Sequence, residues 1–84
     1  MDNQTQPMGL RALTYGEKAV GLTFNPGGDE NVNKVKTLYA QIIDLMDNIT
    51  KSSGPGERTR LAKVSITEAQ GAQMWAVKAI TWKE

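Results

Sequence analysis

The chain has 84 residues and a formal net charge of +1, and it contains neither cysteine nor histidine. These absences exclude a disulfide framework, a thiolate metal site and the commonest general base near neutral pH. Folding of so short a chain buries only about 60–65% of the surface that the unfolded chain exposes. Without disulfides or a metal, its stability must come from packing and self-association. Composition therefore favours a binding protein over an enzyme, with no metal and no cofactor.

The charge balance and the apolar runs also limit the partners. A nearly neutral chain is poorly suited to long nucleic acid, and no apolar run approaches the roughly 20 residues that cross a bilayer. The first residues lack the basic and apolar regions of a signal peptide, which favours an intracellular location.

The N-terminal part divides into a tail and a short helix. Residues 1–9 are polar and carry Pro7 and Gly9, which predicts a flexible tail outside a domain of residues 10–84. Thr14 and Glu17 have the spacing of a capping box, which predicts a short helix over residues 15–20. An irregular lead-in with a chance motif is the alternative.

A long helix is expected after the loop of residues 22–29, which contains a proline and paired glycines. Asp29 or Asn31 would cap the start of this helix. Its apolar residues recur at alternating spacings of three and four, which predicts a coiled-coil seam. The seam consists of Val32, Val35, Tyr39, Ile42, Met46 and Ile49.

A second long helix is expected over residues 57–82, after a break at residues 52–56. The short connection predicts antiparallel packing, and therefore an all-α helical hairpin preceded by a short N-terminal helix. The apolar positions expected in its first half are Leu61, Val64, Ala69 and Ala72. Its second half is apolar on nearly every side and contains Gly71, which indicates close helix contact in an obligate homo-oligomer.

The loop of residues 22–29, called the Phe24 loop below, combines an aromatic residue with paired glycines and leads into a helix start. Together these features suit a nucleotide. Glycines allow close backbone approach, helix amides attract anions, and an aromatic ring stacks on a base. The carboxylates of Asp29 and Glu30 would repel a phosphate at this helix start. The alternative, a plain turn whose Phe24 anchors the end of the hairpin in the core, is favoured by residue chemistry alone.

Cationic residues form the other candidate. Lys36 lies beside the predicted seam and could present an ammonium group from an interface, whereas a solvated lysine is the commoner case. Arg60, Lys63 and Thr67 share one face of the second long helix and suit phosphate recognition. Solvated charge is an equal alternative for that face. Paired carboxylates such as Asp44 and Asp47 are expected to be solvated rather than catalytic.

Four segments together resemble one phage family. They are residues 13–18 (LTYGEK), 24–29 (FNPGGD), 66–70 (ITEAQ) and 72–79 (AQMWAVKA). They are similar to the anti-CBASS cyclic-nucleotide sponges, whose helical hairpin is shared with the anti-Thoeris sponges. The resemblance covers residues 13–82.

The resemblance implies a function that composition does not. Such proteins are not enzymes: they form homohexamers that hold the host's cyclic di- and trinucleotide signals in pockets between subunits, without cleaving them. The host effector is then never activated. The implied place of action is the cytoplasm of the bacterial host.

The resemblance also implies two sets of ligand-binding residues. The dinucleotide pocket corresponds by position to Phe24 and Lys36, with Asn25 nearby. The trinucleotide pocket corresponds to Arg60, Thr67 and Ser65. Lys63 stands where the family pattern has a small residue, so its charge either strengthens phosphate contact or narrows the pocket.

Two other functional classes remain open. A structural or adaptor hairpin that binds a host or virion protein would explain the heptads and tryptophans, but leaves the Phe24 loop without a role. An enzyme acting on cyclic nucleotides would need carboxylates to converge on a metal across an interface. The possible contributors are Asp29, Glu30, Asp44, Asp47 and Glu68.

Overall fold

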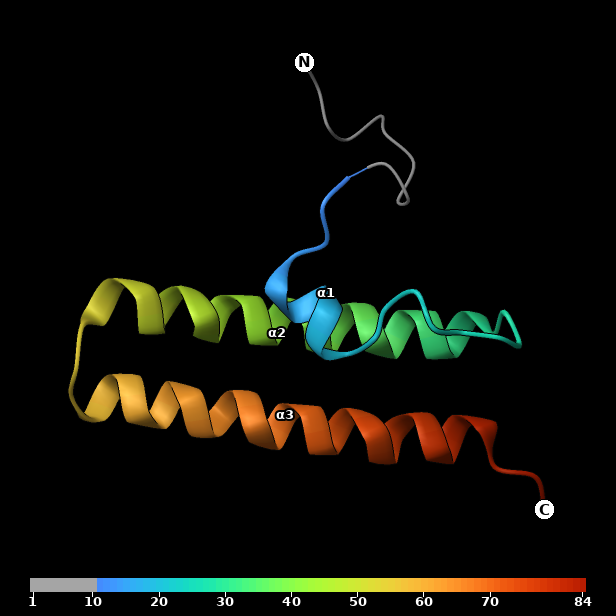
Figure 1. Ribbon diagram of the computed structural model, residues 1–84. Coiled ribbons are helices and arrows are strands. Elements are labelled where there is room, and N and C mark those ends of the chain that lie inside the picture. The colour runs from blue at the N-terminus through green and yellow to red at the C-terminus, as the bar shows by residue number, and fades with distance from the viewer. Residues whose placement is uncertain (1–10) are drawn as a thin grey trace.

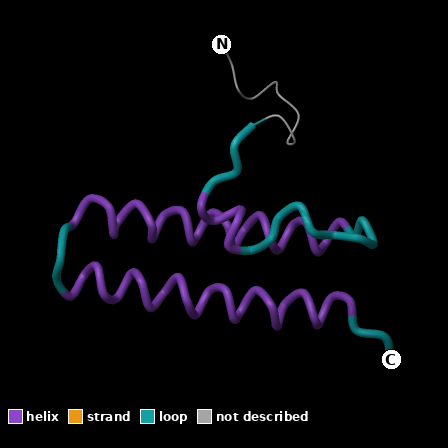
Figure 2. The backbone as a smooth tube through the Cα atoms, viewed as in Figure 1, coloured by secondary structure: helices purple, strands orange, loops and turns teal. Residues whose placement is uncertain are grey.

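The computed structural model describes residues 11–84, and in that range it contains helices and turns but no strand (Figure 2). Helix α1 spans Tyr15–Ala19, α2 spans Glu30–Ser53 and α3 spans Glu57–Thr81. The two long helices run antiparallel and pack against each other, while α1 lies on α2 (Figure 1). The predicted all-α hairpin with a short N-terminal helix is therefore confirmed. The tail predicted over residues 1–9 lies outside the described residues.

The helix ends follow local sequence signals. The Thr14 side chain accepts a hydrogen bond from the Glu17 amide, and the Glu17 carboxylate accepts one from the Thr14 amide. The predicted capping box is therefore present. Asp29 caps α2 by accepting from the amides of Asn31 and Val32 at 2.7 and 3.2 Å, which satisfies two donors that a helix start leaves free.

The turn between the long helices lies within the predicted break but is shorter, because α2 continues to Ser53. Gly54 ends α2 with a φ of 71°, a conformation that glycine adopts without strain. Gly56 precedes α3, and the Thr59 hydroxyl donates to the Gly54 carbonyl across the turn. The short connection forces the long helices to lie side by side in opposite directions.

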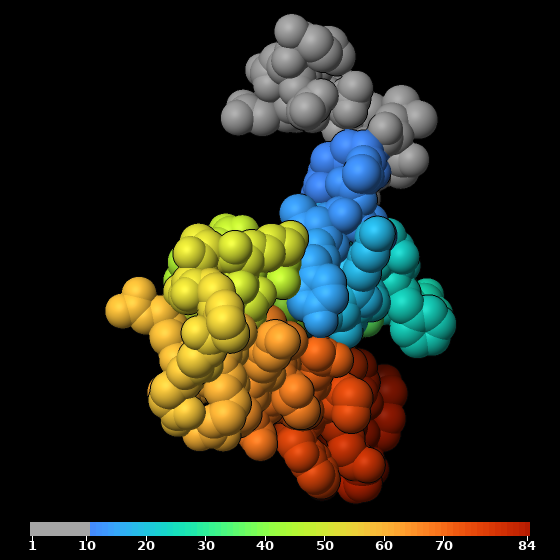
Figure 3. Space-filling model, turned by 60° about the vertical axis from the view of Figure 1, so that its left-hand side comes forward, coloured from blue at the N-terminus to red at the C-terminus, as the bar shows by residue number. Residues whose placement is uncertain are grey.

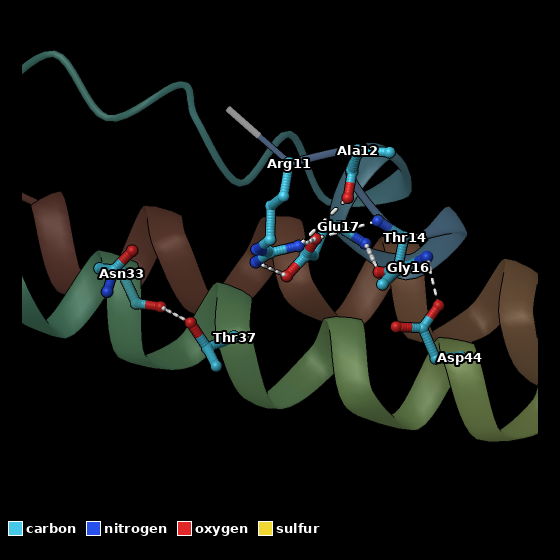
Figure 4. A network of polar contacts seen from close by, with 8 residues as sticks. All are labelled: Arg11, Ala12, Thr14, Gly16, Glu17, Asn33, Thr37 and Asp44. Carbon is cyan, nitrogen blue, oxygen red and sulfur yellow. Dashed lines mark hydrogen bonds and ion pairs between the residues drawn. The ribbon is translucent and has the colours of Figure 1, made fainter. Parts of the chain in front are cut away.

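Helix α1 is held against α2 through Gly16. The Gly16 amide donates to Asp44 Oδ1 at 2.7 Å, and the backbone approaches so closely that a Cβ on Gly16 would lie 2.1 Å from the Ala40 carbonyl oxygen. Arg11 makes a bidentate pair with Glu17, at 2.8 and 2.7 Å, on the other side of this helix (Figure 4). In the space-filling view, α1 and the loop after it stand out from one side of the helix pair (Figure 3).

The Arg11–Glu17 pair makes stability depend on pH. The Arg11 guanidinium holds the pKa of the Glu17 carboxyl below its usual range, because it donates hydrogen bonds to the ionised form. A carboxyl whose pKa is lowered by folding stabilises the protein above its unfolded pKa, about 4.3 for glutamate, and less as the pH falls through the lower folded value. The stabilisation from Glu17 is therefore present at neutral pH and lost in acid.

We expect Glu17→Gln to lower the free energy of unfolding near neutral pH, with a difference from the unchanged protein that shrinks as the pH falls below about 4. Urea unfolding of both proteins across this pH range measures the difference. A difference that stays constant between neutral and acidic pH would contradict this role for the Glu17 charge.

The core lies where α1 and the following loop cover α2 and α3. Its buried apolar residues are Val20, Leu22, Ala40, Ile43, Ile66 and Ala69. Ile43 is 0% exposed and forms the centre of the core. Tyr39 and Met46 pack partly buried against this cluster. The segment that follows α1 and the two long helices therefore share one core.

The buried faces of the long helices agree with the predicted positions in part. Val32 of the predicted seam and Ala69 of the second helix are buried, and the other seam residues except Ile42 are half-buried. On α2 the buried row is Val32, Lys36, Ala40 and Ile43, whereas Ile42 of the predicted seam is exposed. On α3 the row is Ala62, Ile66, Ala69 and Gln73, whereas Leu61 and Val64 are exposed. The buried rows combine alanines with two isoleucines and two long polar side chains, while several large apolar residues remain exposed.

The resulting apolar surface is extensive for so small a protein. Its exposed members on the two long helices are Leu38, Ile42, Leu45, Leu61, Val64, Met74 and Trp75. A Cβ placed on Gly71 meets nothing within 4 Å in the same chain. The close contact expected at Gly71 between subunits stays a prediction. Apolar patches of this kind mark interaction surfaces.

Candidate functional site

The loop between α1 and α2 folds as a chain of tight turns. The Phe24 amide donates to the Gly21 carbonyl at 2.9 Å, and the Gly28 amide donates to the Asn25 carbonyl at 3.0 Å. Gly21 and Gly28 adopt φ angles of 63° and 64°, which favour glycine. The backbone of this loop is thus held in shape before any ligand binds.

Asn25 closes the second of these turns with its side chain. Its Nδ2 donates to the Asp29 carbonyl at 2.9 Å, and its Oδ1 accepts from the Asp29 amide at 3.3 Å. Both ends of the side-chain amide therefore bind the loop itself. The structure places Asn25 at the predicted site, where it shapes the loop that presents Phe24.

Lys36 extends from α2 to the underside of the same loop. It is only 5% exposed, and its Nζ donates to the carbonyls of Gly21 and Phe24 at 2.9 and 2.5 Å. Within residues 11–84 no carboxylate pairs with it. The interpretation of Lys36 as a solvated lysine is therefore wrong, since this ammonium is buried against uncharged partners.

Phe24 projects away from the core. It is 72% exposed, so the alternative in which Phe24 anchors the hairpin end in the core is wrong. The Lys36 Nζ lies 5.5 Å from the centroid of the Phe24 ring, within the range of a cation–π contact. An exposed aromatic ring of the loop and a buried ammonium group from α2 therefore lie side by side.

Phe24, Asn25 and Lys36 all line one cavity of about 460 Å³. This volume is within the range of small-molecule sites. Asp29 and Val32 contribute from the start of α2, and the carboxylate of Asp29 is already bound to the helix amides. The predicted dinucleotide residues are thus brought together in the folded chain.

The other wall of this cavity comes from the end of α3 and was missed by sequence reasoning. It consists of Val77, Ile80, Thr81, Trp82 and Lys83. The antiparallel hairpin offered a signal that could have found it, because antiparallel packing places the end of α3 beside the start of α2 (Figure 1). The predicted break and helix lengths were sufficient for that deduction.

The residues of the predicted trinucleotide pocket are only partly brought together. Lys63 and Thr67 line a second cavity of about 260 Å³, with Tyr15 from α1 and Asp47 from α2 on its far side. Arg60 and Ser65 are not among its lining residues. Within one chain, two of the four residues predicted for the trinucleotide pocket therefore line a common cavity.

Arg60 is instead exposed and engaged within α3. Its Nε and Nη2 donate to the two carboxylate oxygens of Glu57 at 2.9 and 2.6 Å. Glu57 raises the pKa of the Arg60 guanidinium, and Arg60 lowers the pKa of Glu57, because each stabilises the charged form of the other. An exposed ion pair of this kind contributes little to stability, so a competing anion can replace Glu57 at small cost.

A third cavity, of about 440 Å³, lies near the hairpin turn and is mostly apolar. It is lined by Met46, Ile49, Arg58, Leu61 and Ala62. Within residues 11–84 no group of three or more acidic side chains is placed to hold a metal ion. No helix in those residues has the length and apolar character that crossing a membrane requires.

The comparison with protein families decides the relationship of this chain. A family model described as the Acb2/Tad1 hairpin domain matches residues 17–81, which is most of the chain. The chain belongs to the Acb2/Tad1 hairpin family. This is the family of phage anti-CBASS and anti-Thoeris nucleotide sponges, which are known as non-catalytic. Searches of curated proteins and of solved structures found no match.

The region that matches the Acb2/Tad1 hairpin domain contains most of the candidate binding residues. It includes the Phe24 loop, Lys36 and the cationic face of α3. It ends at residue 81, so Trp82 and Lys83 lie beyond it. The matched region thus includes one wall of the Phe24 cavity and ends within the other wall.

Proposed function

We propose that this protein binds and sequesters cyclic di- and trinucleotide second messengers of the bacterial host. The captured ring is held intact, so the CBASS effector that it would switch on stays inactive. Membership of the sponge family supports this function. The observation that carries it in this chain is the exposed Phe24 ring beside the buried Lys36 ammonium, on the rim of a 460 Å³ cavity.

The chemistry of this cavity suits a cyclic dinucleotide. A nucleobase stacks on an exposed aromatic ring, and a phosphate is attracted to a cation that no carboxylate neutralises. Lys36 has three N–H donors and uses two on carbonyls, which leaves one for a phosphate oxygen. Phe24 binds the base in this proposal, Lys36 binds the phosphate, and Asn25 holds the loop in shape.

Cyclic trinucleotides are proposed to bind at the cationic face of α3, formed by Arg60, Lys63, Ser65 and Thr67. The side chains of Arg60, Lys63 and Thr67 are exposed, as an incomplete pocket requires. A neighbouring subunit would complete this pocket. The exposed apolar residues of the long helices support assembly, and the family resemblance suggests a homohexamer.

Titration calorimetry tests the function directly, with cyclic di-AMP, cyclic di-GMP, cyclic GMP–AMP and cyclic tri-AMP as the panel. The bound nucleotide is then released by heat and identified by chromatography. We expect nanomolar binding and recovery of the intact ring, because sequestration requires a Kd well below the signalling concentration. Recovery of cleaved nucleotide would overturn the sponge, and absence of binding by the whole panel would favour the adaptor hairpin.

Arg60→Ala tests the trinucleotide site. We expect it to weaken cyclic tri-AMP binding by about tenfold, the effect of one charge-assisted contact at an exposed position, and to leave cyclic dinucleotide binding within about twofold. Arg58→Ala removes the same charge from the same helical turn and is the matched control. Equal losses for the two variants would indicate general electrostatic attraction, and no loss for either would remove Arg60 from the site.

A further inference from the structure

We infer that residues 11–24 form a strap that opens from α2 as one unit while the two long helices stay packed, and that Asp44 controls this opening. The strap consists of α1 and the segments on either side of it (Figure 1). This conformational device goes beyond the proposed function, because it does not depend on which ligand the protein binds.

Helix α1 depends on α2 for its helical form. It has five residues, whereas an isolated helix needs roughly 12–15 residues to be even marginally stable in water. The capping box and the Arg11–Glu17 pair are contacts within the strap, so they do not attach it to the rest of the protein. The strap is therefore either docked and helical or released and unfolded.

Polar contacts hold the strap to one row of α2. Lys36, Ala40 and Asp44 are each four residues apart and therefore lie on the same face of this helix. Asp44 Oδ1 accepts a hydrogen bond from the Gly16 amide at 2.7 Å, and the Ala40 carbonyl lies against the Gly16 backbone. Lys36 donates to two carbonyls farther along the strap. Helix α2 thus holds the strap with a carboxylate near the start of α1 and with an ammonium group after its end.

Asp44 completes the hydrogen bonding at the start of α1. The first amides of a helix have no partner within it, and the Thr14 side chain binds the amide of Glu17. The next free amide, that of Gly16, belongs to a buried residue, so water is a poor substitute for Asp44. Without the carboxylate, docking would leave a buried donor unsatisfied, which shifts the equilibrium toward the open strap by about tenfold to a hundredfold.

The strap contributes less to the core than the hairpin does. Of the six buried residues in the core cluster, Val20 and Leu22 belong to the strap, and the other four belong to α2 and α3. Those four remain together when the strap is released, because the long helices pack directly against each other. Segments with few buried apolar contacts open at a lower free energy than the whole protein. Release of the strap is therefore a smaller step than unfolding.

Opening changes the surroundings of Lys36. In the closed strap this side chain is 5% exposed and is bound to strap carbonyls. Release breaks these hydrogen bonds and exposes the amine to solvent. The rate at which an amine-directed reagent modifies Lys36 therefore reports the opening, and the exposed Lys34 on the same helix is the internal reference.

Hydrogen exchange followed by mass spectrometry tests the opening, with the whole 84-residue chain in its assembled form and no nucleotide present. The amides of Lys18, Val20, Leu22 and Phe24 donate to carbonyls within the strap, so their exchange measures its release. We expect residues 15–24 to exchange faster than residues 40–46 of α2 and 62–69 of α3. Equal rates for the three segments would mean that the strap opens only when the whole protein unfolds, and would overturn the inference.

Asp44→Ala tests the control of the opening. We expect it to raise the exchange rate of residues 15–24 and the modification rate of Lys36 by about tenfold to a hundredfold, while exchange in α3 stays within about twofold. Asp44→Asn keeps an acceptor oxygen for the Gly16 amide and is expected to have a smaller effect. Asp47→Ala is the matched control, because it removes a carboxylate of the same helix that pairs with Lys51 rather than with the strap.

The outcomes separate control of the strap from a general effect on stability. If Asp44→Ala accelerates exchange in the strap and in α3 equally, Asp44 supports the whole fold and the inference is overturned. Unchanged strap rates in this variant would overturn the control by Asp44. If Asp44→Ala does not fold, the rates of Asp44→Asn and of the unchanged protein decide. Because no nucleotide is present, failure of the proposed function would leave this result standing.

Discussion

Replacing Lys36 with methionine is expected to raise the Kd for a cyclic dinucleotide about 100-fold and to lower the free energy of unfolding by about 2 kcal/mol. Methionine keeps the apolar part of the side chain within the fold. It removes the ammonium that bridges the carbonyls of Gly21 and Phe24. The variant therefore loses both a charge for the phosphate and the tie that holds the Phe24 loop.

The two effects have separate measurements. Calorimetry gives the Kd at a temperature where the variant is folded, and urea unfolding gives the stability. Retained stability with lost binding would contradict the role of Lys36 in holding the loop. Lost stability with unchanged binding would contradict its contact with the phosphate.

Lys34→Met is the matched control for this experiment. Lys34 lies on the same helix and is exposed, so the substitution removes the same charge without disturbing the loop. We expect its Kd to stay within about twofold of the unchanged protein, because exposed charges interact weakly in water. A loss as large as that of Lys36→Met would mean that net charge, and not the buried ammonium, drives binding.

Gly16→Ala is expected to destabilise the protein by about 3 kcal/mol, a cost at the upper end of that found for overpacked sites. A Cβ at this position would lie 2.1 Å from the Ala40 carbonyl oxygen and 2.9 Å from Asp44 Oδ1. The first of these atoms is backbone within α2, so α1 must move away from α2. Alanine favours helices over glycine by about 1 kcal/mol, so any loss of stability reports the clash rather than helix propensity.

Gly71→Ala is the control for Gly16→Ala. It also lies within a helix, but its Cβ would meet nothing within 4 Å in the same chain. Urea unfolding of the isolated chain should show a gain of about 0.5–1 kcal/mol from the better helix former. If Gly71 lies between subunits, as predicted from the sequence, the same variant should dissociate the assembly in sedimentation measurements. If the Gly16→Ala protein were as stable as the Gly71→Ala protein, the close contact of α1 with α2 would be contradicted.

The elements of this fold were predictable because their signals are local. The capping box at Thr14 and Glu17, the cap at Asp29 and the break at Gly54 and Gly56 each act over a few residues. Each signal satisfies or removes backbone hydrogen bonds at a helix end, which depends little on the rest of the chain. The short break then required an antiparallel pair.

Hydrophobic periodicity predicted the buried face of α2 only in part, since Val32 is buried and most of the seam is half-buried. The pattern selected large apolar residues such as Ile42, which the structure leaves exposed. The buried row instead includes Ala40, which allows α1 to approach, and Lys36, whose ammonium reaches the loop carbonyls. When a helix has apolar residues on several faces, the partners that cover it decide which face is buried.

The candidate site was also predicted only in part. Phe24 and Lys36 were predicted from residue type and family resemblance, whereas Trp82 entered only as part of the apolar second half of the second long helix. The residues around position 82 carry no local signal for a cavity, because the opposite wall comes from residues 24–36, which are distant in the sequence. Contacts over such separations depend on how the whole chain folds.

By itself, the sequence determined the helices, their ends and their antiparallel order, because capping, turn formation and helix propensity act between residues close together in the chain. Only the tertiary structure decided that Lys36 is buried and that Phe24 is exposed. Those outcomes depend on competition among several apolar faces for one small core, and on the approach of α1 and the loop to the helix pair. The local pattern of residues does not contain that information.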